Sequence, residues 1–221
     1  MTFSLGSTPR SLVKYNDQSI AAITEIATSA KDSMVLIKTL TASSSGTLAF
    51  VDGADDVVLD NTYPIYVFKF INCHAGPGDV KFQFNMSIDS GSNYNVTKTT
   101  TAFVSYHRED DSDTNFDYYT SSDLAQSTSD QFLHTIADTQ GNNNDDNIVG
   151  TLQIFNPSSA TFVKHFIVRT IFNSNADPAY CVESHIAGYG NTTSAVDAVQ
   201  FKFNSGNIDA GTIKLYGLKD S

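Results

Sequence analysis

The sequence has no tryptophan, only two cysteines and few charged residues. Two cysteines are too few for a disulfide scaffold, and Cys73 and Cys181 each lie in or beside an apolar run. We therefore expect buried free thiols and no Cys73–Cys181 disulfide. No stretch approaches the ~18 apolar residues of a membrane span, and the first ten residues lack the apolar core of a signal peptide. These absences predict a chain that is made and folded in a cytoplasm and has no membrane partner.

Basic residues are scarce. The chain has 13 Lys and Arg against 24 Asp and Glu, a formal net charge of −11. Nucleic-acid phosphates and anionic membranes both attract Lys and Arg, so this balance argues against either as a partner. Only 17% of residues are charged, so the acidity is interpreted as an aid to solubility for a protein that stays outside the cell or in salty water.

Aromatic residues are abundant, with 15 Phe and 10 Tyr. Ser, Thr and Asn fill much of the remaining sequence, and this composition favours strands and polar turns over helices. A chain of 221 residues is long enough for one large β-sandwich with or without a short arm.

Residues 1–32 differ in pattern from the rest. Asp17 is a candidate cap for a short helix in which Ile20, Ile23 and Ala27 share one stripe. So narrow a stripe cannot stabilise an isolated helix. Packing on its own domain and docking on another subunit remain equal alternatives. We divide the chain into an N-terminal attachment arm, 1–32, and a β-sandwich domain, 33–221.

Strand patterns follow one another from Met34 onward, with turn residues between them. Residues 65–71 are apolar on both faces, which predicts a central strand, and residues 80–88 alternate strictly, which predicts a half-buried one. Two long polar loops, 109–130 and 138–147, interrupt the strands. The fold class predicted is all-β, a two-sheet antiparallel jelly-roll-like sandwich. The predicted strands cover 34–40, 47–51, 65–71, 80–88, 102–107, 148–155, 162–172, 187–189, 199–203 and 212–218.

The motifs of the common enzyme classes are missing: there is no zinc-binding His-Glu-x-x-His, no phosphate-binding Gly-rich loop and no Gly-x-Ser-x-Gly elbow. The histidines lack metal-ligand spacing, so hydrogen-bonded structural roles are expected. They are His74, His107, His134, His165 and His185. We assign no catalytic, cofactor-binding or metal-binding residue and expect no cofactor.

The first polar loop is acidic from Glu109 to Asp117, with oxygen ligands at alternate positions as calcium prefers. It lacks the glycine and trailing glutamate of an EF-hand, so a solvated loop is the preferred interpretation, as it is for 142–146. Phe116, Tyr118 and Tyr119 lie in this loop. They are suited either to contact a sugar or a partner or to anchor the loop on its own sandwich, and both interpretations stay open.

Four segments resemble virion proteins of marine tailed bacteriophages. They are AVQFKFNSGNIDAGTIKLYGLK at 198–219, YPIYVFKFIN at 63–72, FNPSS at 155–159 and SLVKYNDQSI at 11–20. The resemblance spans nearly the whole chain. It implies a jelly-roll module held in a trimer or larger symmetric assembly on the particle, with the arm making the attachment. It implies no catalytic residue and no cofactor.

The expected function is that of a non-enzymatic structural protein of the virion, made in the host cytoplasm and displayed as a fibre or appendage module. A capsid decoration protein is the alternative, and a carbohydrate-binding module or polysaccharide-degrading jelly-roll enzyme is a further one. The enzyme would recruit Tyr106, His107 and Arg108, or His165 with Arg169. Expected partners are further copies of the chain (a trimer favoured), other virion proteins and a host surface glycan. Tyr216 and Phe166 are expected in subunit contacts.

Overall fold

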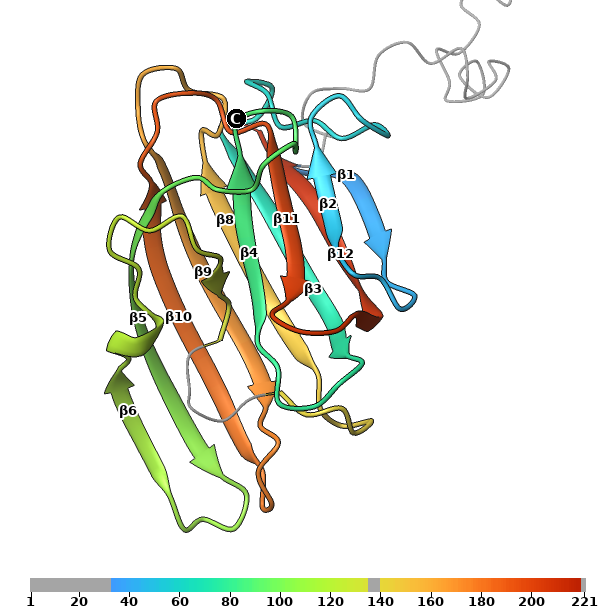
Figure 1. The fold of residues 1–221 in the computed structure, drawn as a ribbon, viewed down its shortest axis with the longest axis vertical. Helices are drawn as coiled ribbons and strands as arrows, with labels where there is room; N and C mark the ends of the chain where they lie inside the picture. The colour runs from blue at the N-terminus through green and yellow to red at the C-terminus, as the bar shows by residue number, and fades with distance from the viewer. Residues whose placement is uncertain (1–32, 135–139, 220–221) are drawn as a thin grey trace, which may run out of the picture. The chain divides into compact units, whose positions relative to one another are not determined.

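The computed structural model describes residues 33–134 and 140–219, and within them the chain forms the predicted β-sandwich (Figure 1). Two antiparallel sheets pack against each other. Most neighbouring strands are not consecutive in sequence, as in jelly-roll-like folds. The large sheet has the order β1 (Met34–Thr41), β12 (Ile208–Leu218), β3 (Ile65–Ala75), β8 (Ile148–Phe155), β9 (Lys164–Asn173), β10 (Tyr180–Gly190), β5 (Lys98–Arg108) and β6 (Thr114–Tyr118). The small sheet has the order β2 (Leu48–Val51), β11 (Ala198–Phe203), β4 (Phe82–Ser87) and β7 (Gln131–Phe132).

An aromatic core lies between the two sheets. Phe201 of β11 stands at its centre, with ring centroids 5.2 Å from those of Phe68 and Phe70 of β3. Edge-to-face and offset rings of this kind add attraction beyond the area that they bury. The rings of Phe50, Phe82 and Phe84 lie within 6.4 Å of Phe201.

The prediction of a central strand at 65–71 is confirmed, because β3 pairs with β12 on one side and β8 on the other. Tyr66, Phe68 and Phe70 face the core, while Val67 is buried on the opposite face. The prediction of a half-buried strand at 80–88 is wrong. In β4 the polar residues Gln83, Asn85 and Ser87 are buried like the apolar ones. Thr128 and Asp130, before β7, bond Gln83 and Asn85, and the turn after β4 bonds Ser87.

Several strand boundaries differ from the prediction, and the two largest differences are a missed strand and an extended one. The loop predicted at 109–130 contains strand β6, which pairs with β5, and a 3-10 turn at Thr120–Ser122. The strand predicted at 187–189 extends back to Tyr180. Side chains in β6 and in the first half of β10 alternate between the two faces of the sheet. Acidic and small polar residues in both segments interrupt the alternation of apolar residues from which strands are predicted.

The arm predicted for residues 1–32, with its helix after Asp17, lies outside the described residues. The strands all belong to one compact unit, Met34–Ser221. In the part of the chain that the structure describes, no helix has the length and apolar character needed to cross a membrane.

Candidate interaction surface

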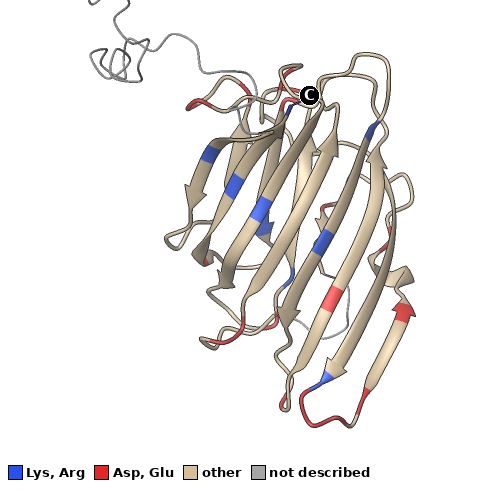
Figure 2. Cartoon of the chain, turned by 180° about the vertical axis from the view of Figure 1, so that it is seen from behind, with Lys and Arg blue, Asp and Glu red and all other residues tan. Residues whose placement is uncertain are grey.

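The outer face of the large sheet, the side turned away from the core, carries an unbroken row of cross-strand neighbours (Figure 2). We call it the central row. From β1 to β6 it consists of Thr39, Lys214, Lys69, Thr151, Arg169, His185, Phe103 and Tyr118. Its first half carries two lysines, and we call it the basic half. Its second half carries three rings beside Arg169, and we call it the aromatic half.

The aromatic half of the central row is exposed. His185 stacks on Phe103 with centroids 4.8 Å apart and an interplanar angle of 5°. Phe103 also contacts Phe116, which is 66% exposed, and Tyr118 is 58% exposed. Tyr119, in contrast, is partly buried against the core. Of the two interpretations left open for these rings, anchoring on the sandwich fits Tyr119. Phe116 and Tyr118 face solvent, as contact with a sugar or a partner would require.

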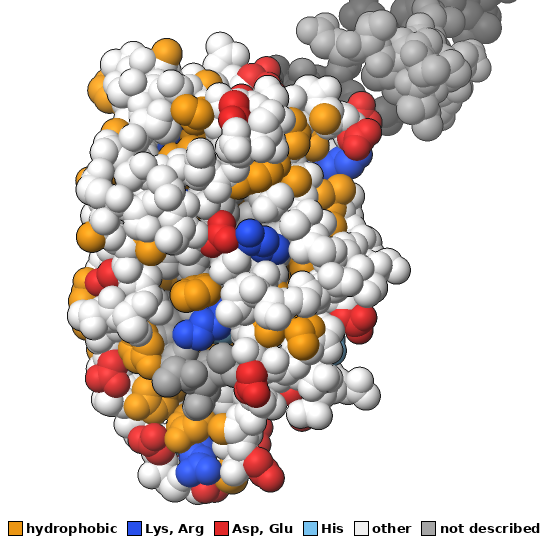
Figure 3. All heavy atoms as spheres, in the orientation of Figure 1, with side chains coloured by type: hydrophobic (Ala, Val, Ile, Leu, Met, Phe, Trp, Pro, Cys, Tyr) orange, Lys and Arg blue, Asp and Glu red, His pale blue; other side chains and the backbone are white. Residues whose placement is uncertain are grey.

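Apolar side chains flank the central row on both sides. Leu36 and Ile167 are 51% and 50% exposed, and Ile71 and Ile171 are exposed as well. Of the nine large hydrophobic residues exposed in the described chain, seven lie on this face, and Ile88 and Phe162 lie elsewhere. Figure 3 shows the other side of the sandwich, where the small sheet lies in front and apolar side chains are interspersed with polar ones. Exposed apolar side chains gathered on one face mark a contact site in soluble proteins.

Charges on the outer face are partly paired. The Arg169 guanidinium donates a hydrogen bond to the Glu183 carboxylate, and His185 Nε2 lies 3.3 Å from Glu183 Oε1. The bond from Arg169 lowers the pKa of Glu183. Lys69 Nζ lies 5.3 Å from the centroid of the Tyr216 ring, a cation–π contact. Glu183 is thus held ionised beside the aromatic half, and Lys69 projects its charge from the basic half.

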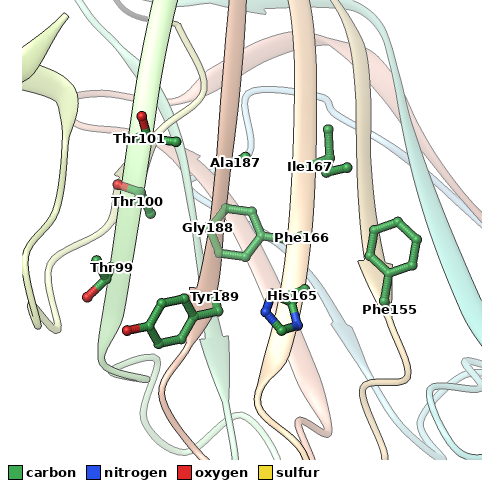
Figure 4. Close-up of a pocket in the computed structure, with 10 residues that line it drawn as sticks. All are labelled: Thr99, Thr100, Thr101, Phe155, His165, Phe166, Ile167, Ala187, Gly188 and Tyr189. Atoms are coloured by element: carbon green, nitrogen blue, oxygen red, sulfur yellow. The ribbon is translucent and has the colours of Figure 1, made fainter.

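A shallow hollow of about 440 Å³ opens on the same face across β8, β9, β10 and β5 (Figure 4). Its floor is Ala187 and Gly188, and its rim carries Phe155, His165 and Tyr189. A Cβ at Gly188 would lie 2.9 Å from the buried Phe166 ring and 2.6 Å from Thr100 Cγ2, so close packing beneath the floor requires glycine. Thr99 and Thr101 add hydroxyl groups to the lining. The hollow offers rings and hydroxyls to a small ligand.

The side chains considered for a lyase site do not converge. Tyr106 packs against the core and His107 is exposed on the opposite face of β5, because neighbouring residues of a strand alternate. His165 and Arg169 share the outer face of β9, but four residues of strand separate them by about 13 Å. The structure therefore brings together neither Tyr106 with His107 nor His165 with Arg169.

Each histidine lies in a packed or paired setting. Nε2 of His74 lies 2.9 Å from the Asn143 carbonyl oxygen, and Nε2 of His107 lies 2.9 Å from Asp111 Oδ1. His165 contacts the Tyr189 ring. His134 is fully buried and its Nε2 accepts the backbone N–H of Phe82 at 3.0 Å. Burial lowers the pKa of His134 to about 3, so this ring is neutral at physiological pH.

The acidic loops use their carboxylates locally. Asp110 accepts hydrogen bonds from the Ser112 hydroxyl and amide, which lower its pKa. In the second loop Asp146 is buried and accepts the Asn143 amide at 3.0 Å. Among residues 33–134 and 140–219, no group of three or more His, Cys, Asp or Glu side chains is arranged to hold a metal ion.

Sequence reasoning missed a buried polar cluster around Lys98. Lys98 is fully buried and its Nζ donates to Asn85 Oδ1 at 2.5 Å and to the Val96 carbonyl at 2.8 Å. Asn85 in turn donates to Asp130 at 2.9 Å, and Asp130 pairs with Lys202 at 3.0 Å. Burial lowers the pKa of Lys98 to about 8. The enclosed, hydrogen-bonded geometry indicates a structural role.

Two expectations about single residues are corrected. Phe166 was expected in subunit contacts, but it is 1% exposed and packs edge-on against Phe84 in the core. Tyr216 does lie on the outer face. Cys73 is a buried free thiol as expected, whereas Cys181 is free but exposed, because it occupies an outward position of β10.

No protein-family model matches the chain, and comparisons with curated proteins and with solved structures find no significant match either. The functional assignment therefore rests on the residues and their geometry.

Proposed function

We propose that this protein is a non-enzymatic structural module of a tailed-phage particle, displayed on the virion surface as part of a fibre or other appendage. The phage setting is supported by the resemblance of residues 63–72, 155–159 and 198–219. The observation that carries the structural role is the exposed outer face of the large sheet, where most of the exposed apolar side chains gather. Such a surface suits contact with another subunit.

The lack of convergence among Tyr106, His107, His165 and Arg169 supports a structural role over a catalytic one. The fold by itself does not indicate an activity, because one fold can serve many functions. A capsid decoration protein would use the same sandwich and the same face, so this assignment is the alternative within the phage setting. The resemblance implies a trimer or larger symmetric assembly, and larger symmetric assemblies also contain two-fold contacts.

The assembly is tested by light scattering on the full-length chain at micromolar concentration, with a matched pair of variants. Ile167→Glu places a carboxylate on the outer face, and Ile88→Glu does so at a similarly exposed isoleucine after β4. We expect an oligomer that Ile167→Glu weakens by tenfold or more, because covering an unpaired charge costs more than ~1.4 kcal/mol. Ile88→Glu should leave the oligomer intact. A monomer in all three samples contradicts the structural role.

The location on the particle is tested by electron microscopy of phage carrying this chain, labelled with antibody against the purified protein. Label on the tail or its fibres supports the appendage, and label over the head supports decoration. Particles without label contradict both.

A second candidate, glycan binding, is favoured by the hollow of Figure 4, because rings stack on sugars while hydroxyls meet their polar edges. We expect Tyr189→Ala to weaken binding of host-surface polysaccharide at least tenfold, measured by calorimetry. Thr192→Ala, outside the hollow, is the control. Equal binding by both variants removes this candidate.

A further inference from the structure

The outer face of the large sheet is complementary to itself. On the central row, Lys214 and Lys69 supply positive charge in β12 and β3, while His185, Phe103 and Tyr118 supply rings in β10, β5 and β6. Ammonium groups are attracted to ring faces and to carboxylates. Glu183 lies beside His185 and is paired with Arg169, so the aromatic half carries a carboxylate whose charge Arg169 balances. One half of the face therefore attracts the other half of a second copy.

The face is large enough for a stable pair. Eight strands spaced about 4.8 Å apart span about 34 Å, and five outward residues along a strand span about 27 Å, so the face covers about 900 Å². Stable protein interfaces bury about 800 Å² on each partner. Face-to-face packing of two sheets is a standard arrangement, with a separation of about 10 Å.

Charge selects one orientation of the two copies. A two-fold axis across the strands places Lys69 on Lys69 and Lys214 on Lys214, which repel. An axis parallel to the strands reverses the order of the strands, so that β12 faces β5, β3 faces β10 and β8 faces β9. Lys214 then faces Phe103, and Lys69 faces the pair of His185 and Glu183. The second orientation joins opposite partners and repeats each contact twice.

We propose that two copies of this chain pack through the outer faces of their large sheets, about a two-fold axis that runs parallel to the strands between β8 and β9. This inference rests on the proposed structural role and specifies its partner. The central row of one copy lies antiparallel to that of the other, with the basic half of each on the aromatic half of its neighbour.

Spin labels at two threonines of the central row test the orientation in the full-length chain. Thr151 lies half a strand spacing from the proposed axis, and Thr39 lies three and a half spacings away. Thr151→Cys and Thr39→Cys are each made with Cys181→Ser, because Cys181 is the exposed native thiol, and Cys73 is buried. The distance between labelled backbones of the two copies should be about 11 Å at residue 151 and about 35 Å at residue 39. Electron paramagnetic resonance measures both.

Equal short distances of about 10 Å at both sites would place the axis across the strands and overturn the proposal. An oligomer in which neither the 11 Å nor the 35 Å distance is found also overturns the proposed two-fold pair, but it leaves the structural role intact. A monomer by light scattering overturns both. If the label at residue 151 itself separates the copies, the residue 39 distance still decides, since the two orientations differ there by about 25 Å.

Discussion

Replacing His134 with glutamine should reduce the stability that the protein loses when the pH falls from neutral to acidic values. Nε2 of His134 accepts the Phe82 amide, and Nδ1 has no hydrogen-bond partner among the described residues. The ring also lies 4.4 Å from the Phe172 ring. Protonation would break the bond to Phe82 and leave a charge in an apolar site, so burial, with a smaller effect from Lys81, lowers the pKa to about 3.

The sign and the size follow from proton linkage. An unfolded histidine has a pKa near 6.5, so between about pH 6.5 and pH 3 the unfolded chain binds a proton that the folded chain refuses. Stability is therefore lost as the pH falls through that window. With these two pKa values, His134 removes about 3 kcal/mol between pH 7.5 and pH 4.5. Glutamine keeps an acceptor for the Phe82 amide but does not titrate, so the variant should lose that much less.

Urea unfolding followed by far-UV circular dichroism measures the effect, at fixed protein concentration because assembly also stabilises. Wild type, His134→Gln and the control His107→Gln are compared at pH 7.5 and 4.5. His107 is exposed and pairs with an exposed Asp111, so its variant should follow the wild type. Identical loss of stability in wild type and His134→Gln would refute the account of the buried neutral ring.

Three further outcomes are expected. Phe201→Ala should lower the free energy of unfolding by about 3–5 kcal/mol in urea titrations, because it empties the centre of the aromatic core. Between pH 8 and pH 10, the stability of wild type should rise relative to Lys98→Met by about 2 kcal/mol, because burial lowers the pKa of Lys98 to about 8 while the unfolded lysine stays mostly protonated. In the native Ile167→Glu variant, whose outer face should be uncovered, a maleimide should modify Cys181 within minutes and Cys73 only after unfolding, as read by mass spectrometry; equal labelling of both would contradict the fold.

Most of the sandwich was predictable because its strands alternate with a period of two. The run 148–155 matches β8 at both ends. The apolar residues Ile65, Val67 and Ile71, on the face opposite the Phe side chains, predict a central strand. Strand β6 was missed although Phe116 and Tyr118 alternate within it, because acidic residues surround them. The strand at β9 was predicted, but which of its side chains face the core and which face solvent was not. Arg169 faces solvent, so Phe166, an odd number of residues away, faces the core.

The interaction surface was less predictable than the fold. Its basic and aromatic residues come from strands far apart in the sequence, and only the sheet order places Lys69 and Phe103 in one row. The same holds for the buried cluster of Lys98, Asn85 and Asp130. Strand alternation predicted Asn85 to be exposed, and nothing local indicates that a later segment covers it.

The unequal size of the two sheets explains why polar residues beneath that segment, such as Asn85 and Lys98, are buried. Four strands cannot cover eight, so the inner side of β5 needs another cover. Residues 124–133 supply it: the Lys98 and Ser127 backbones exchange hydrogen bonds at 2.7 and 3.0 Å, Gln131 accepts from the Thr100 hydroxyl at 2.7 Å, and Leu133 enters the core. Such a cover has no strand ladder along most of its length, so its polar groups and those beneath it must satisfy each other. The inner side of the large sheet is thereby closed within one chain, and its outer side is left for a second.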